Sequence, residues 1–133
     1  MKTALLAFAL VLSVPALATE SDAPALSDPA EFADALESCT VVTHGAPHPF
    51  MRSFTIEHAI TGGDDEACLY SQTMPGGMHM ECRLSQAGRR GLATEFREQA
   101  KGRMSGGTGE QPAWTSECEI VDSTGKRTPM SGG

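Results

Sequence analysis

Three methionines and one histidine lie close together near the middle of the chain. The cluster surrounds the turn sequence at positions 75–77 and consists of Met74, Met78, His79 and Met80. Thioether sulfur and imidazole nitrogen form a ligand set that suits Cu(I) better than hard cations. The spacing therefore indicates a candidate Cu(I) site at the tip of a hairpin.

The run Met78-His79-Met80 beside Met74 resembles the methionine and histidine motifs of periplasmic copper-handling proteins. The resemblance covers only positions 74–80 of the chain, and it implies a Cu(I) carrier or sensor. A second patch of soft ligands lies on an earlier loop and comprises His44, His48 and Met51. The alternative interpretation of the methionines is structural, because methionine is a flexible filler of hydrophobic cores.

The candidate site lies in a segment, 68–84, with the pattern of a β-hairpin. Alternate residues of a strand point to opposite faces, and the even-numbered residues form the more apolar face. A plain two-residue loop would pair odd with even positions, so we predict an odd-length loop or a bulge with a glycine at positive φ. His79 then lies on the face opposite to Met78 and Met80.

Four cysteines, Cys39, Cys68, Cys82 and Cys118, lack the tight C-x-x-C pairing of zinc sites. In an exported chain they predict two disulfides. Because Cys68 and Cys82 share a strand face, we predict the bridge Cys68–Cys82, and Cys39–Cys118 follows by exclusion. A Cys39–Cys68 bridge is the alternative, and it would tie the C-terminal arm to the hairpin.

The first 18 residues have the features of a secretory signal peptide. Lys2 is followed by an apolar run over 4–14 and by a small-x-small cleavage sequence that ends at Ala18. Cleavage near Ala18 leaves 115 residues with 9 basic and 17 acidic side chains, a net charge of −8. We predict a periplasmic or secreted protein without a membrane span, and the acidic balance argues against nucleic acid.

The remaining pattern predicts one small α+β domain stapled by disulfides. Its parts are a flexible leader over 19–27, the domain over 28–121 and a disordered tail over 122–133. Two helices are expected at about 29–38, after the cap Asp28, and at about 86–101, after the cap Ser85.

A three- to four-stranded antiparallel meander is expected beside these helices. The segments that predict its strands are 39–43, 53–61, the hairpin and 114–121. Two prolines make 44–49 an expected irregular loop.

The sequence contains no G-x-S-x-G, H-E-x-x-H or Cys-His nucleophile pattern. Oxidised cysteines cannot act as thiolates. We therefore expect a binding module without enzymatic activity or cofactor, which contacts an unknown envelope protein or peptide through a sheet edge or an exposed loop. The alternative is a Cu(I) carrier or sensor that uses Met74, Met78, His79 and Met80.

Overall fold

The computed structural model describes residues 22–103 and 111–130. The predicted signal peptide, 1–18, lies outside these residues. The helices are α1 (Pro29–Ser38) and α2 (Gln86–Ala100), with two short 3₁₀ helices, η1 (Pro75–Gly77) and η2 (Ala113–Glu117). The strands are β1 (Ala25–Leu26), β2 (Val42–Pro47), β3 (Thr55–Gly63), β4 (Cys68–Thr73), β5 (His79–Leu84), β6 (Cys118–Val121) and β7 (Arg127–Pro129).

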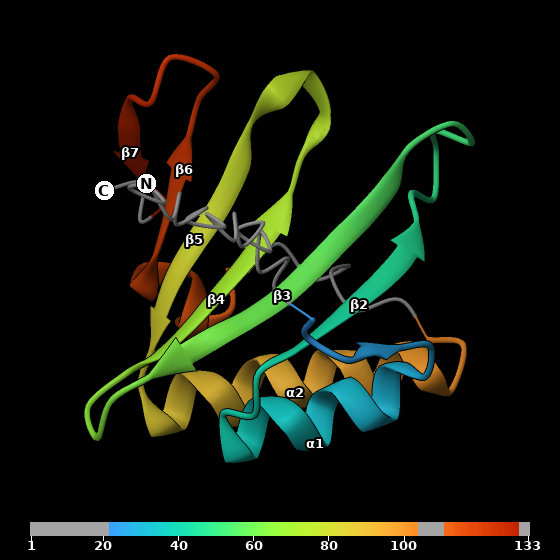
Figure 1. The fold of residues 1–133 in the computed structure, drawn as a ribbon, viewed down its shortest axis with the longest axis vertical. Helices are drawn as coiled ribbons and strands as arrows, with labels where there is room; N and C mark the ends of the chain where they lie inside the picture. The colour runs from blue at the N-terminus through green and yellow to red at the C-terminus, as the bar shows by residue number, and fades with distance from the viewer. Residues whose placement is uncertain (1–21, 104–110, 131–133) are drawn as a thin grey trace, which may run out of the picture.

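These strands form a single sheet in which neighbours along the chain are neighbours in space. β1 runs parallel to β2, and the other pairs are antiparallel. α1 and α2 lie side by side across one end of the sheet, and the β2–β3 and β4–β5 turns project away from them (Figure 1). The small single-domain α+β fold is confirmed, but the mixed sheet is larger than the predicted antiparallel meander.

The core lies between the sheet and the two helices. α1 contributes Phe32 and Leu36 and α2 contributes Leu92 and Phe96, all at most 3% exposed. The opposing residues of β4 and β5 are Cys68, Tyr70, Met80, Cys82 and Leu84. Their burial confirms the predicted apolar face of the hairpin. Each large apolar side chain that is fully buried contributes about 1.5–3 kcal/mol, so this interface is the main source of stability.

Both helices begin at their predicted capping residues. The carboxylate of Asp28 accepts a hydrogen bond from the backbone N–H of Ala30 at 2.8 Å, and Pro29 occupies the first helical position. The hydroxyl of Ser85 accepts from the backbone N–H of Gly88 at 3.1 Å. Local capping chemistry therefore determines where each helix starts.

The turn between β4 and β5 has the odd length that side-chain alternation requires. It covers 74–78, because Thr73 pairs with His79. Gly76 and Gly77 have φ values of 79° and 73°, which glycine adopts without steric cost. The even-numbered faces of the two strands consequently meet.

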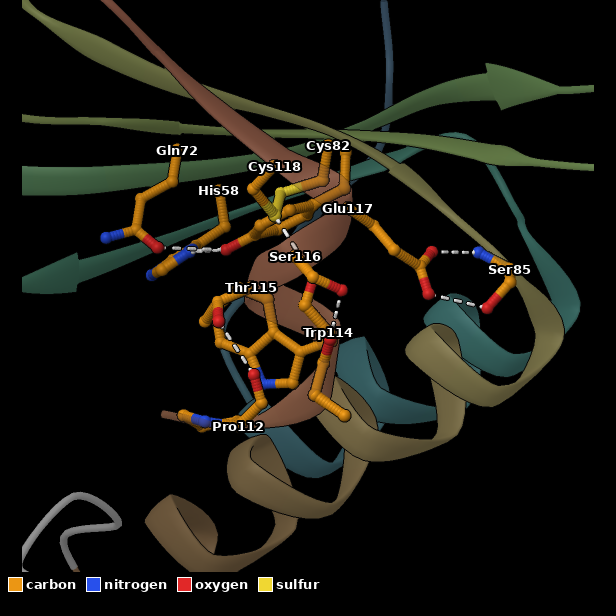
Figure 2. The surroundings of a disulfide bond; sticks show 12 residues. His58, Gln72, Cys82, Ser85, Pro112, Trp114, Thr115, Ser116, Glu117 and Cys118 are labelled. Atoms are coloured by element: carbon orange, nitrogen blue, oxygen red, sulfur yellow. Dashed lines mark hydrogen bonds between the residues drawn. A yellow bond between two sulfur atoms is a disulfide. The ribbon is translucent and has the colours of Figure 1, made fainter. Parts of the chain in front are cut away.

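The disulfide pairing differs from the predicted Cys68–Cys82 and Cys39–Cys118. The bridges are Cys39–Cys68 and Cys82–Cys118, with Cα separations of 5.8 and 4.1 Å. β6 lies beside β5 and places Cys118 directly opposite Cys82 (Figure 2). Cys68 shares a face with Cys82 but pairs with Leu84, so it stays available to Cys39 at the end of α1.

Close contacts surround both bridges. Gly63 lies against the first bridge, where an added Cβ would come within 3.0 Å of the Cys39 sulfur. Near the second bridge, the carboxylate of Glu117 accepts hydrogen bonds from the backbone N–H and the hydroxyl of Ser85 (Figure 2). This contact joins η2 to the beginning of α2.

The predicted flexible leader, 19–27, contains a strand. β1 pairs with β2, and the backbone N–H of Thr43 donates to the carbonyl of Pro24 at 2.9 Å. The Nδ1 atom of His44 donates to the carbonyl of Leu26 at 2.9 Å. Non-local pairing with β2 thus orders a segment that has no strand pattern of its own.

The predicted disordered tail, 122–133, also contains a strand, and its last residues, 131–133, lie outside the described part. The carboxylate of Asp122 accepts from the backbone N–H groups of Thr124 and Lys126 at 2.8 and 3.0 Å. This side chain closes a turn, which returns β7 along β6.

Two strand boundaries also differ. The expected loop at 44–49 is partly strand, because β2 continues to Pro47, and a strand end can accommodate a residue without an N–H. The expected strand at 114–121 begins at Cys118. The hydroxyl of Thr115 donates to the carbonyl of Pro112 at 2.7 Å, which favours the 3₁₀ turn before it.

Candidate functional site

The turn between β2 and β3 exposes large apolar side chains. We call residues 48–54 the aromatic loop. Phe50 is 86% exposed and Met51 is 42% exposed. Exposed apolar side chains are common singly, but two neighbours at the end of a projecting hairpin form a candidate contact surface.

Hydrogen bonds hold the aromatic loop in a defined turn. The backbone N–H of His48 donates to the carbonyl of Phe54 at 2.9 Å, and the N–H of Phe54 donates to the carbonyl of Met51 at 3.0 Å. The Nδ1 atom of His48 accepts from the N–H groups of Phe50 and Met51 at 3.2 and 3.1 Å. In this arrangement Nδ1 is the acceptor of both bonds and carries no hydrogen.

Aromatic packing adds to this order. The ring of His48 makes edge contacts with the rings of Phe50 and Phe54, at centroid distances of 6.2 and 5.9 Å. Pro47 and Pro49 restrict the backbone on either side of His48. The exposed phenylalanine is therefore presented by an ordered turn.

The predicted Cu(I) ligands do not share one environment. Met80 is 4% exposed and belongs to the core, Met74 packs partly against it, and Met78 is 36% exposed. His79 lies on the opposite face, where its Nε2 is 2.8 Å from a carboxylate oxygen of Glu81. Burial of Met80 supports the structural interpretation, and Cu(I) binding stays a prediction.

The second predicted patch, of His44, His48 and Met51, is also divided. His44 is 2% exposed and stacks on His58 with ring centroids 5.7 Å apart. His48 and Met51 lie in the aromatic loop. Among the described residues, no group of three or more histidine, cysteine, aspartate or glutamate side chains is arranged to hold a metal ion.

A buried polar chain connects β3 and β4. The hydroxyl of Tyr70 donates to the amide oxygen of Gln72 at 3.1 Å and lies 2.7 Å from Nδ1 of His58. A tyrosine hydroxyl has one hydrogen, so Nδ1 of His58 is the donor in the second bond. Burial, and secondarily the neighbouring His44, lowers the pKa of His58 from 6.5 to about 4.

The phenol of Tyr70 is similarly held in its neutral form. Burial raises the pKa of Tyr70 above its ordinary value of 10.0, and the nearby carboxyl of Glu95 adds to that shift. His58 and Tyr70 therefore form a neutral hydrogen-bonded pair inside the core. This arrangement stabilises the fold without supplying a strong base.

No protein-family model, curated protein or solved structure matches this chain. Within the described ranges, no helix combines the length and apolar character that crossing a membrane requires. The two disulfides are typical of an oxidising, extracellular or periplasmic environment.

Sequence reasoning emphasised the soft metal ligands and missed Phe50. The available signal was its position in a proline-rich loop, between Pro49 and Met51. An apolar pair in such a segment cannot belong to a regular strand or helix face. It could therefore have been recognised as a candidate contact surface.

Proposed function

We propose that the chain is a non-enzymatic module that binds a protein partner by inserting Phe50 into an apolar pocket on that partner. The observation that carries this proposal is the 86% exposure of Phe50 on a hydrogen-bonded turn. Met51 extends the contact beside it. The partner is an unidentified protein of the cell envelope or the extracellular space.

The energetics of an ordered loop favour this use. Burial of a phenylalanine side chain contributes about 1.5–3 kcal/mol, and aromatic anchors in pockets commonly dominate protein interfaces. A loop that is ordered before binding loses less conformational entropy on association. The hydrogen bonds to Nδ1 of His48 supply that order.

A role without catalysis is supported by the hydrogen bonds of His58 and His48. The Nδ1–H group of His58 donates a hydrogen bond to the hydroxyl oxygen of Tyr70, and the pKa of about 4 makes His58 a weak base. His48 uses its Nδ1 to hold the aromatic loop. In both histidines Nδ1 is therefore bonded to a group that holds the fold, and it is not placed to activate a nucleophile.

Export by the predicted signal peptide, 1–18, belongs to the same proposal. Cleavage near Ala18 would release the protein into the periplasm or the medium. Two disulfides suit such a compartment.

The proposal is tested with immobilised protein and an envelope extract from the source cells. We expect Phe50→Ser to lower recovery of a specific bound protein at least about tenfold, which corresponds to about 1.4 kcal/mol. Val41→Ser is the matched control, because Val41 is also an exposed apolar residue, at 44%, but lies beside the end of α1. Equal recovery by wild type and Phe50→Ser would reject the aromatic loop as the contact.

A further inference from the structure

A cleft of about 320 Å³ lies between the sheet and α2. Its floor is formed by His58, Tyr70 and Gln72, and α2 supplies one wall. The ends of β2 and β3 supply the other wall, and Trp114 of η2 closes one side. The cleft thus combines apolar walls with a few polar side chains, as small-molecule sites commonly do.

One charged group lines the cleft among the described residues. Glu95 projects from α2, and one of its carboxylate oxygens accepts a hydrogen bond from the indole N–H of Trp114 at 3.0 Å. Partial burial raises the pKa of the Glu95 carboxyl above 4.5, against the smaller opposing effect of the Trp114 bond. Within the described part of the chain, Glu95 makes no ion pair with lysine or arginine.

Aromatic residues accompany this carboxylate. Trp114 is partly exposed beside the cleft, and Phe96 and Tyr70, each 2% exposed, lie directly beneath its surface. Aromatic rings attract cations through the negative charge of their faces. A carboxylate that forms no ion pair with any described residue, set beside an indole ring and aliphatic walls, is complementary to an organic cation that carries an apolar body.

We propose that the cleft binds a small organic ammonium compound, with the ammonium group at Glu95 and the apolar tail between α2 and the β2–β3 hairpin. Ile56 and Leu92 provide aliphatic surface for the tail. Pro49 of the aromatic loop also lines the cleft, but Phe50 does not, so each of the two proposals can fail without the other.

A larger hollow, of about 620 Å³, lies over the opposite face of the sheet between β4 and β7. Three of the five charged side chains that line it form ion pairs with one another. Arg127 lies 2.6 Å from a carboxylate oxygen of Glu81 and 3.2 Å from one of Glu119.

The test compares three probes of equal chain length, n-hexylammonium, 1-hexanol and hexanoate. Trp114 is the single tryptophan of the chain, so its emission reports binding beside Glu95. Titration calorimetry at neutral pH measures the three affinities independently of fluorescence. We expect hexylammonium to bind about tenfold more tightly than hexanol, and hexanoate to bind most weakly.

Two variants locate the charge effect. Glu95→Gln keeps a hydrogen-bond acceptor for Trp114, and we expect it to reduce the preference for hexylammonium over hexanol to within about twofold. Glu66→Gln makes the same change in net charge at an exposed turn and should preserve the preference. Absence of hexylammonium binding to the wild type, equal binding of the three probes, or an unchanged preference in Glu95→Gln would overturn the proposal.

Discussion

The β2–β3 and β4–β5 turns both project away from the helices, but they place similar apolar residues in different environments. At the β4–β5 turn, Met74 packs partly against the core and Met78 is 36% exposed, and Met80, which follows in β5, is 4% exposed. At the β2–β3 turn, Phe50 is 86% exposed and Met51 is 42% exposed. Apolar side chains beside the first turn are mostly used for folding, whereas those of the second remain available to another molecule.

The difference arises from what covers each hairpin. β5 is flanked by β6, and the Cys82–Cys118 bridge keeps the C-terminal arm against it. The aromatic loop extends beyond the helices, and its hydrogen bonds are made within the loop itself. A turn ordered by its own backbone can leave its apolar side chains exposed.

The largest difference is expected in stability. Met80→Ala should destabilise the protein by about 2–5 kcal/mol, because it leaves a cavity in the core. Phe50→Ala should change stability by no more than about 0.5 kcal/mol. Urea unfolding with the disulfides intact measures both changes, and a larger cost for Phe50→Ala would reverse the assignment of the two turns.

Lowering the pH should reduce the stability of the folded protein through the buried residue His58. Its pKa is about 4 in the folded protein against 6.5 for an unperturbed histidine, so its stabilising effect is complete above pH 6.5 and is lost as the pH falls toward 4. The loss is about 3 kcal/mol. Urea midpoints across this range should show that His58→Gln has a shallower pH dependence than wild type, and an identical dependence would contradict this.

A smaller effect on stability is expected at the glycines of the β4–β5 turn. Gly77 has a φ of 73°, which costs an alanine about 1–2 kcal/mol. Gly77→Ala should therefore lower the free energy of unfolding by that amount. Gly91→Ala, within α2, is the control, since helical backbone accepts alanine readily; equal losses would argue against the observed turn.

The smallest effect is expected for Cu(I) binding at the β4–β5 turn. Because Met80 is buried and His79 lies on the other face, we expect no stoichiometric Cu(I) binding at the β4–β5 turn in the presence of a competing chelator. Met78→Ser should then behave like wild type. Tight binding by wild type that Met78→Ser abolishes would favour the carrier or sensor interpretation.

Local patterns predicted the helices and the hairpin register well. Asp28 and Ser85 mark helix starts through bonds to their own neighbours, and side-chain alternation required the odd-length turn. These features depend on residues only a few positions apart. They can therefore be inferred from the sequence.

Features that depend on distant segments could not be inferred in this way. The bridge partner of Cys82 follows from the position of β6, and the order of β1 depends on its pairing with β2. The apolar character of Met80 and Phe50 is equally evident in the sequence, but their burial depends on which elements cover them. The candidate site was missed for this reason.

Site-specific photo-crosslinking tests the central claim most directly. A photoreactive phenylalanine analogue is placed at Phe50 in one variant and at Met78, in the other turn, in a second, and both are irradiated in the source cells. We predict a discrete adduct with one protein from position 50 that excess wild-type protein suppresses, and no such adduct from position 78. No adduct from position 50, or the same adduct from both positions, would contradict the assignment of the aromatic loop as the binding surface.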